Sequence, residues 1–286
     1  MSRVTTCTIR AHATVAERSA ALGAVRDLAT PAGVPQLPAR FLRHADDHTV
    51  VGVRAVQRAM AGWSAPAGDR GEVESFDRWG VVAATCGAGR PASARTLVQY
   101  RDGGPVTVSP HVVPQCSLHA TASAVSVGLG MHGPNIGVGG GTEAVGEGLL
   151  AALSIVAEPG VAGCWLVFTA WDEEPSLDDV GNAPSDATCR AIAFALDSTT
   201  SGAMRLSLRS TPALAIAGRE APPVPCDPRE SVLAPLAPWL AALDSRGGAQ
   251  VGERLPLTMH LGWGATVTLE VDGTATKSPQ TGRLTA

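Results

Sequence analysis

The sequence has no long apolar run, and this absence excludes a large class of proteins. No apolar stretch approaches the roughly 20 residues that a membrane-spanning helix needs, and the opening residues MSRVTTCTIR lack the apolar core of a signal peptide. We therefore expect a cytoplasmic protein without a membrane partner.

Lysine is almost absent, and no basic patch replaces it. One of the 22 Lys and Arg residues is a lysine, Lys277, and the formal net charge is −4. Since no basic run carries interleaved aromatic residues, nucleic acid is not expected as a partner. The excess of Arg, Ala and Gly is typical of a GC-rich coding sequence.

Cysteines are few and lie far apart. No C-x-x-C pair occurs, which argues against a zinc site and against a small disulfide framework. We expect reduced thiols and predict no metal or cofactor site. The six cysteines are Cys7, Cys86, Cys116, Cys164, Cys189 and Cys226.

Strand-like and helical patterns alternate along the first two thirds of the chain. Apolar or β-branched runs over residues 5–15, 79–85, 135–138 and 163–174 predict strands, and patterns over 46–63, 114–131 and 142–157 predict helices. Asp46 or Asp47 is placed to cap the first helix. This alternation predicts an α/β layered fold with a mostly parallel central sheet and helices on both faces.

The remaining segments are less regular. Residues 189–198 and 203–211 predict a hairpin with TTSG in its turn. A Pro-rich linker over 222–228 then suggests a division into residues 1–218 and 219–286. The second part holds one predicted helix, a final strand around 256–271 and a polar tail.

The segment LGMHGPNIGVGGGTEAVGEGLLAAL, residues 129–153, combines a short strand, a glycine run and a long apolar helix. Such a turn often presents a reactive group at the start of its helix. That position is held by Thr142, between Gly141 and Glu143, and no obvious nucleophile is present. One interpretation is structural: the glycines serve only a tight strand-to-helix connection.

A second interpretation is a dinucleotide site. Gly139, Gly141 and Ala144 fit G-x-G-x-x-[GA], and Asp172 and Glu173 end the following strand. However, two strands and two helices precede this turn, whereas the fingerprint usually opens its domain. The acids also come later than the roughly 20 residues expected.

The third interpretation is a resemblance to the β-ketoacyl synthases of the thiolase superfamily. Active members carry G-P-[NS]-x-T-V-D-T-A-C-S-S, and GPNIGVGGGTEA, residues 133–144, is similar to it without a gap. The flanking segments follow the family's order over residues 4–211, about the N-terminal half of its fold. The resemblance implies a thiolase-like fold and a role in fatty-acid or polyketide-type biosynthesis.

The departures from the family pattern bear on activity. Thr142 stands where the family has its cysteine, and a threonine hydroxyl is too weak an acid to replace a thiolate without an adjacent base. The family's H-G-T and G-H motifs are absent, since Leu261 follows His260 and Lys277 stands alone in the polar tail. The resemblance therefore suggests an inactive subunit similar to a chain-length factor.

Such subunits pair with an active ketosynthase, shape its acyl tunnel and meet the acyl carrier protein through the complex. In the family, the strand before the nucleophile and the preceding small-residue helix form the contact between subunits. The resemblance thus places the following residues at the interface or tunnel: Cys116, His119, Met131, Asn135, Ile136, Gly137 and Val138.

Several single residues admit other roles. A divergent thiolase-fold acyltransferase could use another thiol, such as Cys116, although an i,i+3 Cys116–His119 pair on one helix is poorly oriented for attack. His119 is interpreted as a buried or interface residue rather than a ligand. The cluster His44, Asp46, Asp47 and His48 is interpreted as helix capping and solvation rather than metal ligation.

Overall fold

The computed structural model describes residues 3–63, 76–199, 204–210, 231–244, 256–261 and 265–271. The Pro-rich linker, Cys226, the expected boundary near residue 218, most of the TTSG turn and the polar tail lie outside these residues. Described elements from both sides of that boundary share one sheet, in which β6 (Met204–Ser210) pairs with β8 (Ala265–Val271).

One eight-stranded mixed sheet forms the centre of the molecule, in the order β3-β2-β4-β5-β1-β6-β8-β7. The strands not yet given are β1 (Arg3–Arg18), β2 (Trp79–Cys86), β3 (Asn135–Gly140), β4 (Gly163–Trp171), β5 (Thr188–Asp197) and β7 (Leu257–His260). Among the described strands, β2 pairs in parallel with β3 and with β4, and the other five pairings are antiparallel. The expectation of a mostly parallel sheet is therefore wrong.

The long strand β1 lies where the sequence predicted a hairpin of β5 with β6. Its residues 8–18 pair with β5 and its residues 3–8 pair with β6, so β1 lies between two strands that follow one another in the sequence. The predicted hairpin of β5 with β6 is wrong, because each of these strands finds its partner in the N-terminal segment. The predicted final strand is also two strands, β7 and β8, which pair with each other.

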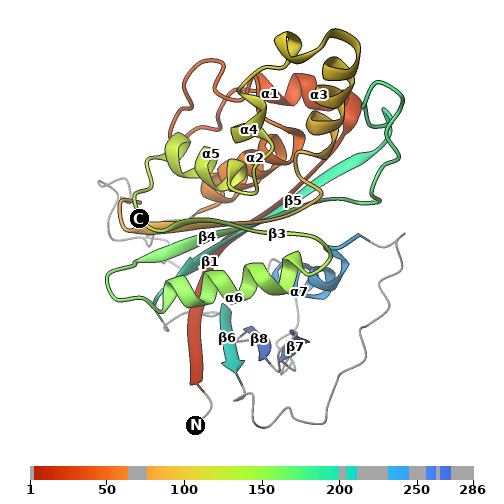
Figure 1. Ribbon diagram of the computed structural model, residues 1–286. Coiled ribbons are helices and arrows are strands. Elements are labelled where there is room, and N and C mark those ends of the chain that lie inside the picture. Colours follow the sequence, from red (N-terminus) through yellow and green to blue (C-terminus); the bar gives the residue numbers. More distant parts are fainter. Residues whose placement is uncertain are drawn as a thin grey trace, which may run out of the picture.

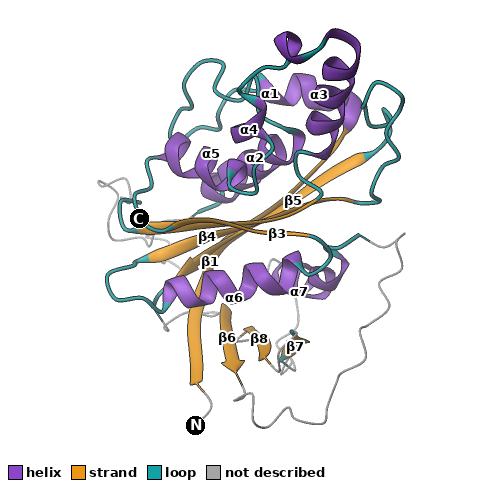
Figure 2. Ribbon diagram, viewed as in Figure 1, coloured by secondary structure: helices purple, strands orange, loops and turns teal. Residues whose placement is uncertain are grey.

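Helices cover both faces of the sheet, as the sequence predicted (Figure 1, Figure 2). One face carries α1 (Leu22–Arg26), α2 (Asp47–Ala61), α3 (Arg90–Gly103), α4 (Val112–Gln115) and α5 (Ala120–Leu129). The other carries α6 (Ala144–Val156) and α7 (Ala237–Asp244). The single helix predicted over residues 114–131 is thus two, because residues 116–119 form a turn between α4 and α5.

Each face of the sheet has its own hydrophobic core, and β4 contributes to both. All nine residues of β4 are buried, as expected for a strand covered on both sides. Trp165 and Val167 belong to the core under α2, whereas Leu166 and Phe168 belong to the core under α6. This fully buried strand fixes the positions of the two strand ends that flank the candidate site, Cys86 of β2 and Trp171 of β4.

Candidate functional site

The glycine-rich turn connects β3 to α6 and leaves three exposed residues, Gly141, Thr142 and Glu143, before the helix. The helix begins at Ala144, two residues later than the sequence predicted. Its N-cap residue, Glu143, makes no side-chain hydrogen bond to the first turn. The first backbone N–H groups of α6 therefore lack a side-chain cap beside Thr142, where a helix carries partial positive charge.

Two of the glycines are required by geometry. Gly139 and Gly140 have φ angles of 91° and 98°, a region that side chains disfavour. A Cβ atom on Gly139 would lie 2.9 Å from both the Cβ of Ala144 and the carbonyl oxygen of Thr85. The close approach of α6 to the end of β2 thus depends on glycine, as the structural interpretation of the turn expects.

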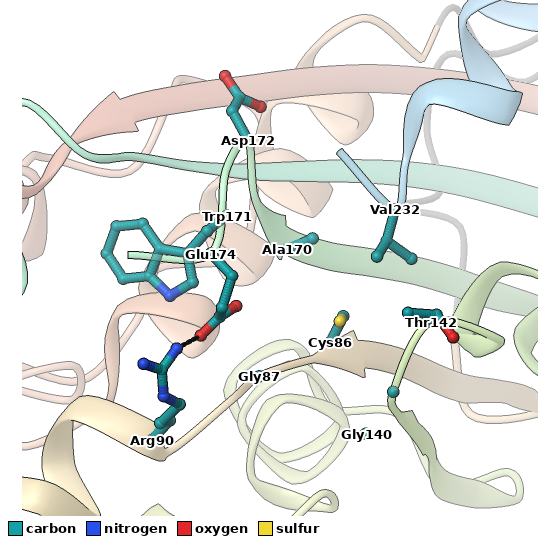
Figure 3. A pocket seen from close by; sticks show the side chains of 11 residues that line it. Cys86, Gly87, Arg90, Gly140, Thr142, Ala170, Trp171, Asp172, Glu174 and Val232 are labelled. Carbon is teal, nitrogen blue, oxygen red and sulfur yellow. Dashed lines mark hydrogen bonds and ion pairs between the residues drawn. The ribbon is translucent and has the colours of Figure 1, made fainter. Parts of the chain in front are cut away.

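A cavity of about 340 Å³ lies beside this turn, at the carboxyl ends of β2, β3 and β4 (Figure 3). This volume lies in the lower part of the range usual for small-molecule pockets. The lining combines the turn, the two strand ends and charged loop residues: Cys86, Gly87, Arg90, Gly140, Gly141, Thr142, Ala170, Trp171, Asp172, Glu174 and Val232.

Charged side chains on one wall of the cavity are held in ion pairs. Arg90 forms an ion pair with Glu174 and donates a second hydrogen bond, of 2.9 Å, to the carbonyl oxygen of Pro175. Asp172 accepts two hydrogen bonds from Arg190, at 2.6 and 2.8 Å. The Arg90–Glu174 pair holds the loop after β4 against the start of α3, and the Asp172–Arg190 pair holds the residue after β4 to β5.

Sequence reasoning missed most of this cavity. It named Gly141 and Thr142 at the turn, and Asp172 for a dinucleotide site, but gave no role to Cys86, Arg90 or Glu174. These residues could have been found from their position after a strand. Residues that follow neighbouring parallel strands lie together at one edge of the sheet, where binding sites often form. Using that signal requires the strand order, which the sequence pattern does not give.

Behind the cavity, the start of α2 forms a buried polar cluster. Asp46 caps α2 by accepting a hydrogen bond of 2.8 Å from the Thr49 backbone N–H, and it accepts another of 3.0 Å from the Gly89 N–H. His48 Nδ1 lies 3.1 Å from the Thr169 hydroxyl. The predicted capping role of Asp46 is confirmed. Within the described residues, no group of three or more His, Cys, Asp or Glu side chains is arranged so that it could hold a metal ion.

His48 is completely shielded from solvent, and this burial lowers its pKa, although the nearby carboxylates of Asp46, Asp47 and Glu174 act in the opposite direction. Its ring meets that of Trp171 edge to face, with centroids 5.8 Å apart. The Nε2 atom of His48 and the Nε1 atom of Trp171 have no hydrogen-bond partner. The cluster therefore holds Trp171 in place at the edge of the cavity.

The residues expected at a subunit interface differ in how far they are exposed to solvent. Ile136 is 38% exposed on β3, which ends the sheet, and His119 is exposed just before α5. His119 is thus not the buried histidine that one interpretation allowed. Asn135, Gly137, Val138 and Cys116 are half-buried.

Met131 differs from these residues, because its side chain is 3% exposed and belongs to the core under α2 and α5. It is not presented on the surface of this chain, and its assignment to the interface or tunnel stays a prediction. Cys116 contacts the loop after β2, where a Cβ on Gly89 would lie 2.7 Å from the Cys116 Cα, but it does not line the cavity.

Two solved structures share the fold of this chain over almost its whole length. The ishigamide ketosynthase/chain length factor aligns with a TM-score of 0.55 and 16% identity, over 94% of this chain and 99% of that chain. A ketosynthase in complex with its chain length factor from Xenorhabdus doucetiae aligns with a TM-score of 0.54 and 12% identity, over 93% and 99%.

A third likeness is partial. A β-ketoacyl synthase from Burkholderia phymatum STM815 aligns with a TM-score of 0.45 and 19% identity, over 69% of this chain; the chain spans 59% of that synthase. No protein-family model matches the sequence, and no curated protein matches it.

The first two likenesses show that the chain has the α/β, thiolase-like fold of the ketosynthase and chain length factor structures. This is the fold that the resemblance over residues 133–144 implied. The dinucleotide interpretation loses its basis, since a mixed sheet with only three strands in parallel is not the parallel sheet of such a domain. Within the described part of the chain, no helix has the length and apolar character needed to cross a bilayer.

Proposed function

We propose that this protein is a chain-length-factor-like subunit that does not catalyse condensation itself. It pairs with a ketosynthase that carries the reactive cysteine and shapes the space for the growing acyl chain. The observation that carries the proposal is the position of β3 at one end of the described sheet, beside a glycine turn that holds Thr142 where the resemblance expects the nucleophile.

The edge position of β3 supports pairing. A strand at the end of a sheet presents backbone N–H and C=O groups that a second chain can pair with. Ile136 adds an exposed apolar side chain to this edge. A Cβ on Gly137 would overlap the carbonyl group of Leu118, so the turn before α5 packs closely against β3. The edge strand and this turn thus form one surface.

Exposed apolar side chains are frequent in the segment of the chain that leads up to β3. Among the described residues, seven of the ten large hydrophobic side chains that are well exposed lie between residues 97 and 136 of the sequence, including Val106 at 92% and Val113 at 74%. Leu118 and Ile136 belong to the surface formed by β3 and the turn before α5, and exposed apolar side chains there suit a protein interaction site. The seven residues are Leu97, Tyr100, Val106, Val113, Leu118, Val127 and Ile136.

Loss of condensation follows from the chemistry at the start of α6. Thr142 is exposed, and the neighbouring carboxylates in the cavity, Asp172 and Glu174, are each held by an arginine. No base within the described residues is shown to contact its hydroxyl. A hydroxyl without an adjacent base is a poor nucleophile. The partner ketosynthase therefore supplies the acyl-bearing cysteine, and an acyl carrier protein delivers its substrates to the complex.

Native mass spectrometry of a tagged copy purified from its own host tests the proposal. We expect equal copies of this chain and a ketosynthase with an acyl-reactive cysteine, and no elongation of acyl thioesters by this chain alone. Recovery of the chain only with itself, or condensation by the isolated chain, would overturn the proposal.

A further inference from the structure

The turn between β2 and α3 attracts carboxylates of the chain itself. Gly87 and Gly89 have φ angles of 73° and 74° in this turn. The Gly89 N–H donates to Asp46 at 3.0 Å, and a Cβ atom on Gly87 would lie 2.7 Å from the Oε2 atom of Glu174. Left-handed glycine turns before a helix start form concavities that bind anions. The turn is therefore a carboxylate site, and two side chains of the protein already approach it.

The two carboxylates differ in how firmly they are held. Asp46 is buried and accepts backbone hydrogen bonds from both Gly89 and Thr49. The side chain of Glu174 is 41% exposed, and it pairs with Arg90, which is exposed to a similar degree. Because an exposed ion pair contributes little to stability, Glu174 can leave Arg90 at a low cost. Asp46 is a fixed part of the structure, whereas Glu174 is exchangeable.

An unused donor lies next to the exchangeable carboxylate. Trp171 is 2% exposed and lines the cavity, and its indole Nε1 has no hydrogen-bond partner. Figure 3 shows the nitrogen edge of this indole turned toward the Arg90–Glu174 pair. A buried donor without an acceptor is costly, so such groups usually mark a place where a water molecule or a ligand oxygen binds. The carboxylate of Glu174 satisfies Arg90 and leaves the indole without an acceptor.

The charges on this wall of the cavity favour a monovalent carboxylate as the ligand. Arg90 pairs with Glu174 and Arg190 pairs with Asp172, so the two ion pairs together are neutral. Exchange of Glu174 for another carboxylate preserves this balance at Arg90, whereas a phosphate dianion would add negative charge near Asp172. A carboxylate also has two oxygens, of which one can bind a guanidinium and the other an indole N–H.

We propose that this end of the cavity binds a small monocarboxylate, which replaces Glu174 at Arg90 and accepts a hydrogen bond from the Trp171 indole. Arg90 keeps its place during the exchange, because its second hydrogen bond goes to the carbonyl oxygen of Pro175. Glu174 turns to solvent and acts as an internal competitor of the ligand. Binding is non-covalent. The site goes beyond the pairing role, since it lies within one chain and away from β3.

Acetate is the probe, because it carries the carboxylate of Glu174 on a single methyl group. NMR spectra of the isotope-labelled indole N–H groups of the full chain record all six tryptophans, and Trp171→Phe and Trp165→Phe assign two of the signals. Acetate, at constant ionic strength, should move the Trp171 signal downfield along a saturating curve. The Trp165 indole is also buried and unpartnered but does not line the cavity, so its signal should stay in place.

Three results of this titration would overturn the proposal. They are the absence of a saturating shift at Trp171, an equal shift at Trp165, and an equal shift at Trp171 when chloride replaces acetate. The last result would indicate a general response to anions rather than a site for a carboxylate.

Two variants test the exchange with Glu174. Arg90→Gln removes the cation, and the affinity for acetate should fall about 10-fold. Glu174→Gln removes the charge of the internal competitor, and the affinity should rise about 3- to 5-fold, as expected for displacement from an exposed ion pair. Glu173→Gln is the matched control, because Glu173 is the exposed neighbour of Glu174 and does not line the cavity.

The control variant should bind acetate as the wild type does, and unchanged positions of the other indole signals show that each variant is folded. Equal affinities of Glu174→Gln and Glu173→Gln would mean that Glu174 does not compete with the ligand, and would overturn the proposal. An unchanged affinity in Arg90→Gln would do the same.

Pairing and acetate binding can fail separately. Native mass spectrometry with the ketosynthase, without acetate, reports on pairing, whereas the titration uses this chain alone. Acetate binding without pairing would remove the proposed function and retain this site, and the reverse result would remove only this site.

Discussion

The two long helices that begin near the carboxyl edge of the sheet, α2 and α6, start in opposite ways. At the start of α2, Asp46 closes the first turn and also binds the Gly89 N–H, and Asp47 pairs with Arg26 at 2.7 Å. At the start of α6, three exposed residues precede the helix and no side chain caps it. We call the start of α2 closed, because a side chain of the protein caps it, and the start of α6 open, because no side chain does.

Under the proposed function, this difference separates a structural helix start from a functional one. Backbone N–H groups at a helix start need partners, and a chain that supplies them gains stability. At the start of α6, the Ala144 N–H donates to the carbonyl oxygen of Gly141 at 3.2 Å, and the N-cap residue Glu143 supplies no side-chain cap. The comparison therefore predicts that changes at α2 act on folding, whereas changes around α6 act on binding and chemistry.

The largest expected effect is at the closed start. Asp46→Ala removes the cap of α2 and leaves the buried Gly89 N–H without its acceptor, so the free energy of unfolding should fall by about 2–4 kcal/mol. Urea denaturation measures this loss. Asp46→Asn, which keeps one acceptor oxygen, should lose clearly less. Equal losses in both variants would contradict the hydrogen-bond explanation.

The pH dependence of stability tests the buried His48. Because the folded chain holds the pKa of His48 below its ordinary value of 6.5, the unfolded chain takes up the proton first as the pH falls. Stability from this group is complete above about pH 6.5 and should fall below it by at most ~1.4 kcal/mol per pH unit.

Asp47 opposes this trend, since burial raises its pKa and its contribution is lost as the pH rises. Urea midpoints for wild type and His48→Gln between pH 7 and 5.5 isolate the histidine. The variant should show the flatter profile, and parallel profiles would show that His48 does not titrate on unfolding.

The elements around both helix starts were predictable because local patterns define them. Asp46 before the apolar face of α2, the buried run of β4 and the glycine turn before α6 each carry their signal within a few residues. The sequence places the start of α6 at Thr142, and the structure places it at Ala144. A difference of two residues is common at helix ends. The GPN turn with its flanking order was enough to identify the thiolase-like fold.

The remaining features depend on contacts between distant segments. Residues 189–198 and 203–211 look like a hairpin locally, but β1 pairs with both and separates them. Cys86 and Trp171 become neighbours of Thr142 only because β2 lies between β3 and β4. No periodicity in the sequence encodes that order, so the cavity could not be predicted although each strand was.

A substitution of Ile136 tests whether the edge strand β3, which precedes the turn to α6, contacts the partner. Ile136→Lys places a charge on the edge strand, and affinity for the partner ketosynthase should fall about 10-fold or more, or roughly 1.4 kcal/mol. Leu28→Lys is the matched control, because Leu28 is 57% exposed and lies after α1, away from β3. Titration by biolayer interferometry measures both. A similar loss in both variants would indicate a general effect of added charge.

The smallest effect on stability is expected at Thr142 itself. Thr142→Cys introduces a cysteine where the β-ketoacyl synthases that residues 133–144 resemble carry theirs. Because the position is exposed, the free energy of unfolding should change by less than about 0.5 kcal/mol. Condensation should still be absent, because a thiol at this position lacks the histidines that the resemblance associates with condensation. Thr142→Ser is the matched control for the side-chain change, and a malonyl-thioester decarboxylation and elongation assay measures activity. Condensation by Thr142→Cys alone would mean that only the nucleophile had been lost, and the open start of α6 would then be an intact active site rather than the surface of a partner subunit.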